Sequence, residues 1–286
     1  MSDIQDALGN LRQRVNVMTR HPLDDRLVIL YDDHRWLLNV LFKIQKEGLL
    51  PEPPKLVFFD SHDDAGDTQP KSQLLESLGV KNVLDATEKA FSAFVDYDIR
   101  TDDGNWLSVA CELNLVSDVV VVGDKYSHNF ESMNGIYTSE DGTTHHLYNL
   151  SEDLDFELGG RGSLGDSFKE DEFKGIREFF DVKDGYNHVR LGNLSPFILD
   201  FDLDFFTLNT NEGTLAWPLQ IWEKHFAHYT AGNYFVKDLI NKAEVITICR
   251  EPDYCGNIGG IAGANYNLMN LDRYFFNGEL GTKLYY

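Results

Sequence analysis

The sequence contains few of the features that mark secreted, disulfide-bonded or membrane-spanning proteins. Its three cysteines, Cys111, Cys249 and Cys255, are an odd set without the Cys-x-x-Cys spacing of a zinc knuckle. No apolar run approaches the ~20 residues that a transmembrane helix needs. The N-terminal segment lacks the charged, apolar and small-residue sections of a signal peptide. We therefore expect a cytoplasmic protein that does not engage a membrane.

Basic residues are scarce as well. The chain has 25 lysines and arginines against 47 acidic residues, which gives a formal net charge of −22. A protein that binds a phosphate backbone needs a basic face, so we expect no nucleic-acid partner. An acidic surface steers cationic molecules toward it, but acidity also serves solubility alone. Composition therefore leaves the role of the charge open.

The apolar pattern predicts one α/β domain over residues 1–286. Hydrophobic residues make up 42% of the chain, and neither an internal repeat nor a linker is evident. Buried-strand runs alternate with segments of helical periodicity over short connections, which predicts a three-layer fold with a mostly parallel sheet. The clearest predicted strands are 26–31, 56–59, 118–123 and 244–249. Residues 151–192 are polar and glycine-rich, so we expect a long loop or flap insertion there.

The stretch after the predicted strand 56–59 carries ionisable side chains. In open α/β sheets, ligands bind beyond the carboxyl ends of strands. Asp60, His62 and Asp64 alternate in this stretch, so an extended chain would direct all three the same way. Histidine and aspartate are common metal ligands, although a solvated acidic turn has the same composition. This stretch alone leaves both interpretations open.

A second run places Asp200, Asp202 and Asp204 at alternating positions. Three carboxylates on one side of a buried strand repel one another unless a positive charge lies among them. A divalent cation would supply that charge; an exposed amphipathic edge strand is the alternative. His34 follows the predicted strand 26–31, one β-α-β step before Asp60, so it should reach the same edge of the sheet. The coincidence of these groups favours a metal site.

Two of these stretches resemble motifs of the arginase, agmatinase and histone-deacetylase superfamily. Residues 60–64 read Asp-Ser-His-Asp-Asp, similar to its Asp-x-His-x-Asp motif, and residues 201–204 read Phe-Asp-Leu-Asp, similar to its Phe-Asp-x-Asp motif. The upstream metal histidine of the superfamily lies one β-α-β step earlier, as His34 does. The resemblance covers about residues 26–65 and 196–255, and it implies an arginase-like fold.

The resemblance also implies a dinuclear metal centre. One ion would be held by His34, Asp60, Asp64 and Asp202. The other would be held by His62, Asp60, Asp202 and Asp204. Mononuclear zinc deacetylases of the superfamily need fewer of these ligands, and mixed histidine and carboxylate sites suit Mn²⁺. We therefore expect two Mn²⁺ per chain, bridged by Asp60 and Asp202.

The sequence departs from the arginase pattern in several places. The usual Gly-Gly-Asp-His-Ser is Tyr-Asp-Asp-His-Arg at residues 31–35, and two phenylalanines replace the Asp-Pro that follows the second motif. No histidine aligns with the arginase proton shuttle; the unranked substitutes are His128, His145, His146 and His188. The combination is most similar to the peptide arginases of ribosomal natural-product pathways, which convert arginine residues of a precursor peptide to ornithine and urea.

The resemblance implies a manganese-dependent hydrolase that acts on C–N bonds of an arginine-containing precursor peptide. Two ions would lower the pKa of a shared water, and Asp64 would help to pass its proton to the leaving amine. Glu251 follows the last strand, where arginases place a glutamate that binds the guanidinium, although a surface glutamate before a proline turn is as consistent with the sequence. Asp124, at another strand end, is a weaker candidate for substrate binding.

Two other functions fit the same ligand pattern. A metal-dependent deacetylase of acyl-lysine or acetylpolyamine substrates would release acetate instead of urea. A non-catalytic metal-binding module that recruits a partner would hold ions without turnover.

Overall fold

The computed structural model describes residues 17–20, 27–50, 52–99, 104–122, 135–149, 196–210, 213–228, 231–255, 260–278 and 280. Its strands are β1 Val17–Arg20, β2 Leu27–Tyr31, β3 Lys55–Phe59, β4 Val119–Val122, β5 Ile136–Thr138, β6 Thr144–Asn149, β7 Phe197–Asp202, β8 Thr207–Thr210, β9 Gly213–Ala216 and β10 Val245–Cys249. Its α-helices are α2 Leu37–Lys46, α3 Lys71–Leu78, α4 Glu88–Tyr97, α5 Trp106–Glu112, α9 Leu219–Phe226, α10 Ala231–Lys242 and α11 Gly260–Phe275. Short 3-10 helices are η1 His34–Trp36, η2 Val83–Asp85 and η4 Leu203–Phe206.

Within the described residues, the main sheet has eight strands in the order β1-β2-β10-β7-β3-β4-β6-β5. The six inner strands, β2, β10, β7, β3, β4 and β6, run parallel to one another. The two edge strands, β1 and β5, are antiparallel to theirs. The predicted α/β fold with a mostly parallel sheet is therefore confirmed.

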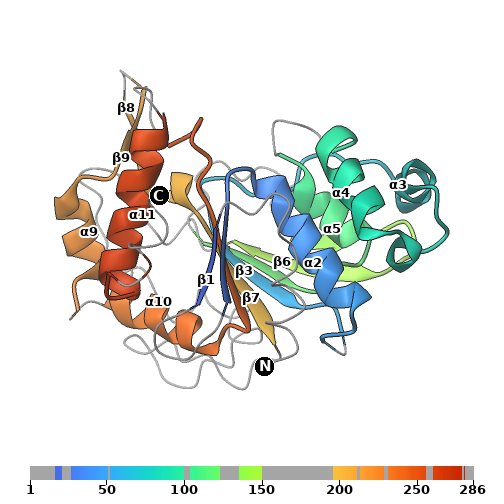
Figure 1. Cartoon of the computed structure of the whole chain (residues 1–286), viewed down its shortest axis with the longest axis horizontal. Helices are drawn as coiled ribbons and strands as arrows, with labels where there is room; N and C mark the ends of the chain where they lie inside the picture. Colours follow the sequence, from blue (N-terminus) through green and yellow to red (C-terminus); the bar gives the residue numbers. More distant parts are fainter. Residues whose placement is uncertain are drawn as a thin grey trace.

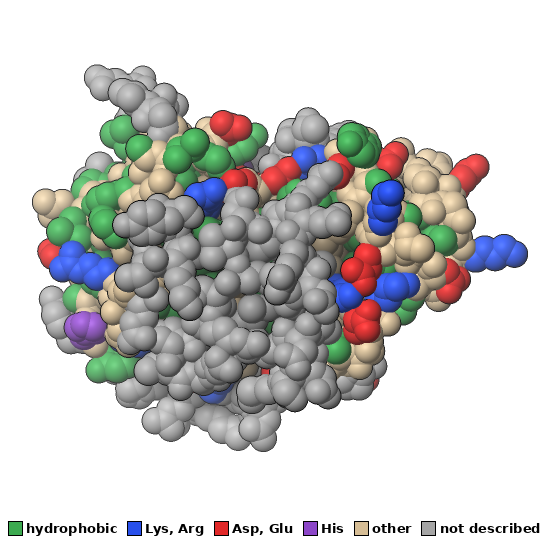
Figure 2. Space-filling model, viewed as in Figure 1, with side chains coloured by type: hydrophobic (Ala, Val, Ile, Leu, Met, Phe, Trp, Pro, Cys, Tyr) green, Lys and Arg blue, Asp and Glu red, His purple; other side chains and the backbone are tan. Residues whose placement is uncertain are grey.

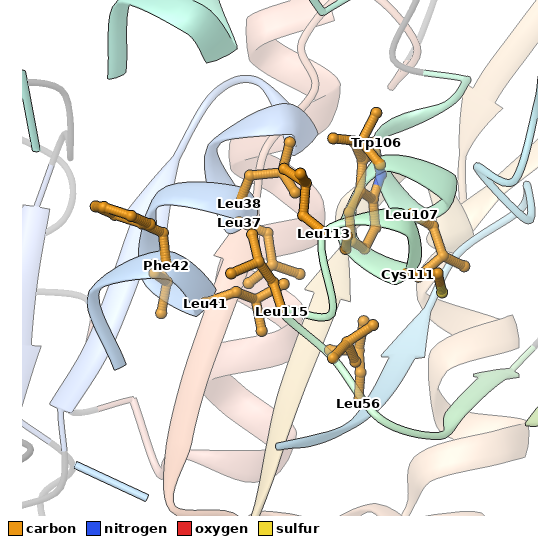
Figure 3. Close-up of a cluster of buried hydrophobic side chains, with 14 of the residues drawn as sticks. Leu37, Leu38, Leu41, Phe42, Leu56, Trp106, Leu107, Cys111, Leu113 and Leu115 are labelled. Carbon is orange, nitrogen blue, oxygen red and sulfur yellow. The ribbon is translucent and has the colours of Figure 1, made fainter. Parts of the chain in front are cut away.

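Helices cover both faces of the sheet, which makes three layers (Figure 1). Alternate residues of each strand enter different cores because side chains of a strand point to opposite faces. Val57 and Phe59 pack with α9, α10 and α11 in one core. Leu56 and Phe58 pack with α2, α4 and α5 in the other. Figure 3 shows the leucine-rich part of this second core, with Trp106 of α5 at its upper end.

Parallel pairing brings the carboxyl ends of the central strands to one level. Phe59 of β3 pairs with Phe201 of β7, so Asp60 follows β3 beside the end of β7. Cys249 at the end of β10 pairs with Asp202. All residues that follow these strands therefore meet at the same edge, as the sequence predicts.

Strands β2 and β3 are consecutive in the chain but lie apart in the sheet. The two strands are not neighbours, because β10 and β7 lie between them. His34 still reaches the cluster after β3, since it lies in η1 beyond the end of β2. Strand β1, which includes Val17 and Met18, has no clear signal in the sequence.

Two glycines bring α11 close to the loop that follows β10. A Cβ at Gly260 would lie 1.4 Å from the carbonyl oxygen of Pro252, and one at Gly263 would lie 2.1 Å from that of Cys255. Only glycine fits at such separations. The helix is thereby held against the loop that carries Glu251.

The described surface and helices have two further features. On the described part of the face in Figure 2, lysine and arginine side chains lie among acidic ones without forming a continuous basic patch. None of the described helices is long and apolar enough to cross a membrane. The predicted insertion at 151–192 lies outside the described residues.

Candidate metal centre

His34 enters the site from the 3-10 helix η1. Asp33 precedes this helix and accepts a hydrogen bond from the backbone N–H of Arg35 over 3.1 Å, which caps the helix start. The same carboxylate forms an ion pair with the Arg35 guanidinium. The turn is thus fixed by its own side chains, and it places the fully buried His34 ring over the end of β7.

Residues 60–64 form a turn and do not continue strand β3. The carboxylate of Asp60 accepts a hydrogen bond from the backbone N–H of His62 over 2.8 Å. Asp64 has a φ of 47°, in the left-handed region, and its carbonyl accepts a hydrogen bond from Leu107 over 3.1 Å. The expectation of an extended chain with alternating side chains is therefore wrong here. A turn of this kind brings the three side chains together by curvature.

The alternation at 200–204 also ends early. Asp202 is the last residue of β7, and Asp204 lies in η4. The Asp202 carboxylate caps η4, because it accepts a hydrogen bond from the Asp204 backbone N–H over 2.9 Å. Asp202 and Asp204 therefore reach the site from a strand end and the helical turn that follows it.

The first group of potential ligands surrounds Nδ1 of His34. This nitrogen lies 3.2 Å from Oδ2 of Asp60, 3.2 Å from Oδ2 of Asp202 and 2.9 Å from Oδ2 of Asp64. His34, Asp60 and Asp202 offer ligand atoms within 4.8 Å of one another. These are the four residues that the resemblance assigns to the first ion.

The second group surrounds the imidazole of His62. Its Nδ1 lies 3.0 Å from Oδ2 of Asp204 and 3.5 Å from Oδ1 of Asp60. These three residues also have ligand atoms within 4.8 Å of one another. Asp60 belongs to both groups, which is the position expected of a bridging carboxylate. Ser61, which the sequence does not single out, donates its hydroxyl to Asp204 over 2.8 Å.

The electrostatics of the site favour a cation. Burial and the nearby charges of Asp64 and Asp204 raise the pKa of Asp60 to about 7. Burial and the charge of Asp204 raise the pKa of Asp202 well above its usual range. Burial opposes a charge on His34, but its carboxylate neighbours raise the pKa of its imidazole. So much buried negative charge is costly unless positive charge is bound there.

Three buried atoms at the centre of the site have no hydrogen-bond partner among the described residues. They are Nδ1 of His34, Oδ2 of Asp60 and Oδ2 of Asp202. Buried polar atoms normally have hydrogen-bond partners. Here the two carboxylate oxygens each lie 3.2 Å from the His34 nitrogen. An ion coordinated at this point would satisfy all three. The donor set, carboxylate oxygens with imidazole nitrogens, fits a divalent cation such as Mn²⁺.

The site is most open at His62. The His62 side chain is 44% exposed, whereas those of Asp60 and Asp204 are 2% exposed. The ring of Tyr254 lies edge-on to His62, with a centroid distance of 6.3 Å.

Glu251 lies on the loop after β10 and faces the same site. Its carboxylate offers an oxygen within 4.8 Å of atoms of Asp202 and Cys249, and the residue is 7% exposed. Its backbone φ of 34° is unusual for a glutamate. Arg250 pairs with Asp32 through its guanidinium at 2.5 and 2.9 Å, which ties this loop to the end of β2. Because Glu251 is buried, it is not the surface glutamate that the sequence also allowed.

Of the remaining sequence candidates, only His145 and His146 fall within the described residues. Asp124, His128 and His188 lie outside the described residues. His145 contacts the carbonyl of Ser117, and His146 contacts the carboxylate of Asp118. Ser117 and Asp118 precede β4, so these histidines lie at the opposite edge of the sheet.

Asp200 and Trp106 contact members of the site in ways that the sequence did not predict. Asp200 carries the same alternating pattern as Asp202, but it lies one strand repeat deeper and contacts Nε2 of His34 at 2.9 Å. Trp106 donates its indole N–H to Asp64 over 2.5 Å, and its ring packs on His34 with a centroid distance of 4.6 Å. The Trp106 contacts depend on the packing of α5 on the sheet, which the sequence does not show.

Comparison with known proteins gives limited similarity. No family model and no curated protein sequence matches the chain. A Helicobacter pylori arginase structure aligns over 89% of this chain and 72% of that protein, with a TM-score of 0.44 and 9% identity. A triple mutant of T. brucei arginase-like protein bound with Mn²⁺ aligns over 86% of this chain and 60% of that protein, with a TM-score of 0.34 and 13% identity. These TM-scores and identities identify neither a family nor an activity for this chain.

Proposed function

We propose that this protein is a binuclear-metal hydrolase of the arginase superfamily that converts arginine residues of a peptide to ornithine and urea. The observation that carries the proposal is the pair of ligand groups, around His34 and around His62, that share Asp60 at one sheet edge. A carboxylate shared between two histidine-containing groups could bridge two ions and hold them close together, as two-metal hydrolysis needs. The two Mn²⁺ ions would lower the pKa of a water molecule so that it attacks at neutral pH.

The chain's own residues supply substrate recognition. Glu251 is a buried carboxylate beside Asp202 that belongs to neither ligand group around the two histidines. We assign it to the substrate guanidinium, which it would bind through charge-assisted hydrogen bonds. The net charge of −22 would raise the local concentration of a cationic peptide.

Asp64 is the residue that we assign to proton transfer. Its Oδ2 accepts the Trp106 N–H over 2.5 Å, which fixes the carboxylate in place. In the balanced reaction, water adds to the guanidinium carbon, the bond to the side-chain nitrogen breaks, and urea leaves. Asp64 would carry a proton from the water to that nitrogen, which becomes the ornithine amine.

The test is incubation of the Mn²⁺-loaded protein with an arginine-containing peptide, followed by detection of both urea and ornithine. Loss of CN₂H₂ and loss of an acetyl group have the same nominal mass, so released urea or acetate must be identified directly. Urea from the arginine peptide supports the proposal. Acetate from an acetyl-lysine peptide would instead indicate a deacetylase. Bound Mn²⁺ with neither product would indicate the non-catalytic module.

A further inference from the structure

Asp200 is a fully buried carboxylate that none of the assigned roles uses. Its Oδ1 accepts hydrogen bonds from the hydroxyl of Tyr31, over 2.5 Å, and from the hydroxyl of Thr247. Its Oδ2 contacts Nε2 of His34 at 2.9 Å. Both oxygens thus have hydrogen-bond partners within the sheet and the His34 turn.

The partners of Asp200 come from adjacent strands of the sheet. Tyr31 ends β2, Thr247 lies in β10, and Asp200 lies in β7, in the spatial order β2-β10-β7. Thr247 is the register partner of Asp200. Burial and the charge of Asp200 raise the pKa of the Tyr31 phenol, so it stays protonated and remains a donor. The carboxylate is therefore held rigidly by the sheet.

We propose that Asp200 is a positioning residue that fixes the tautomer of His34. A carboxylate can only accept, so its contact requires that Nε2 of His34 carries a proton. Nδ1 then presents its lone pair to the point where Asp60 and Asp202 converge. Such a carboxylate–histidine–metal arrangement orients the ring and strengthens the nitrogen as a ligand. The inference rests on the metal-binding part of the proposed function.

Replacement of Asp200 by asparagine separates this role from simple packing. The amide oxygen of Asp200→Asn would keep the hydrogen bonds from Tyr31 and Thr247, which directs its NH₂ group at His34. An NH₂ group donates, so Nε2 would have to accept and the neutral ring would carry its proton on Nδ1, the wrong position for a metal. A hydroxyl can donate or accept, so Asp200→Ser permits either tautomer. Asp200→Ser, although the less conservative change, should therefore bind metal better than Asp200→Asn.

The experiment is calorimetric titration of the metal-free proteins with Mn²⁺ alone. We expect Asp200→Asn to weaken the His34 ion by about 10- to 100-fold, and Asp200→Ser to weaken it less, with the His62 ion retained in both. Asp272→Asn is the matched control and should bind as wild type does, because it removes a buried carboxylate of α11 that accepts from the Leu280 backbone N–H. Thermal unfolding of the metal-free variants should rank Asp200→Asn closer to wild type than Asp200→Ser.

Two results have distinct meanings. Wild-type protein that binds no Mn²⁺ overturns the proposed function itself. Wild-type protein that binds two ions, with Asp200→Asn equal to or tighter than Asp200→Ser, overturns only the positioning role. If Asp200→Asn does not fold, nitrogen NMR of the histidine-labelled, Zn²⁺-loaded wild type decides instead. A proton on Nε2 of His34 supports the proposal, and a proton on Nδ1 contradicts it.

Discussion

The indole N–H of Trp106 and the nitrogen Nδ1 of His34 meet at a single oxygen, Oδ2 of Asp64, at 2.5 and 2.9 Å. The Trp106 ring also packs on the His34 ring. One side chain of α5 thus holds two members of the metal centre, which come from separate segments of the chain. This contact links the second hydrophobic core directly to the site.

Trp106→Phe should therefore weaken metal binding as well as stability. The variant keeps most of the packing but leaves the Asp64 carboxylate without its indole donor, a loss of about 1–3 kcal/mol in the free energy of unfolding. Chemical denaturation and Mn²⁺ titration measure the two effects. Trp217→Phe is the control, because that indole donates to the carbonyl of Thr207 over 3.0 Å. Equal Mn²⁺ affinity in the two variants would contradict a role for Trp106 at the site.

Removal of the shared carboxylate should cost both ions. We expect about two Mn per chain in the wild type and none retained in Asp60→Ala, because Asp60 belongs to both ligand groups. Of the two histidine-containing groups, Asp202 lies in the His34 group only, so Asp202→Ala should lose the His34 ion, and it should lose both ions if Asp202 bridges as the resemblance implies. His62→Ala should lose one ion only, since His62 belongs to one group. Elemental analysis after dialysis measures these contents, and full metal retention in either aspartate variant would exclude a bridging role.

The stability of the metal-free protein should fall as pH rises through about 7. The pKa of Asp60 is raised to about 7 in the folded protein, against 3.8 in the unfolded chain. Folding therefore takes up a proton between these values, and the stabilisation is lost when the carboxyl ionises. The raised pKa values of His34 and His62 act in the same direction.

Thermal unfolding at pH 5 and pH 8 checks this sign. We expect the midpoint of the metal-free wild type to drop by several degrees, and Asp60→Asn to show a smaller drop. Excess Mn²⁺ should reverse the trend, because ions compete with protons for the same carboxylates. A metal-free protein that gains stability between the two pH values through Asp60 would refute the prediction.

Glu251→Gln should separate substrate binding from metal binding. Loss of one charged hydrogen-bond partner costs about 1.5–3 kcal/mol, so kcat/KM for an arginine peptide should fall about 10- to 100-fold. The Mn content should stay at the wild-type value, since Glu251 is assigned no ion. Asp253→Asn, on the exposed neighbour two positions along, should leave both unchanged. Metal loss in Glu251→Gln would instead make Glu251 a ligand.

Local sequence patterns identified the central strands of the fold. Continuous Val, Leu and Phe runs identify β3, β4 and β10, because strands covered on both faces have no polar side to display. The same runs end in Asp60 and Glu251, so the edge that carries the site followed from parallel pairing. The edge strand β1 was missed, since an antiparallel edge needs no such pattern.

The sequence by itself determined which residue types end the central strands, and hence that carboxylates and imidazoles gather at one edge. It did not determine their directions. Alternation predicted one common side for residues 60–64, yet a turn with Asp64 at positive φ brings them together. Asp200 and Trp106 hold His34 and Asp64 through contacts between segments far apart in the chain, at sequence separations of 166 and 42 residues. Such contacts depend on strand order and helix packing, so only the tertiary structure decided which carboxylates surround Nδ1 of His34 and which one contacts its Nε2.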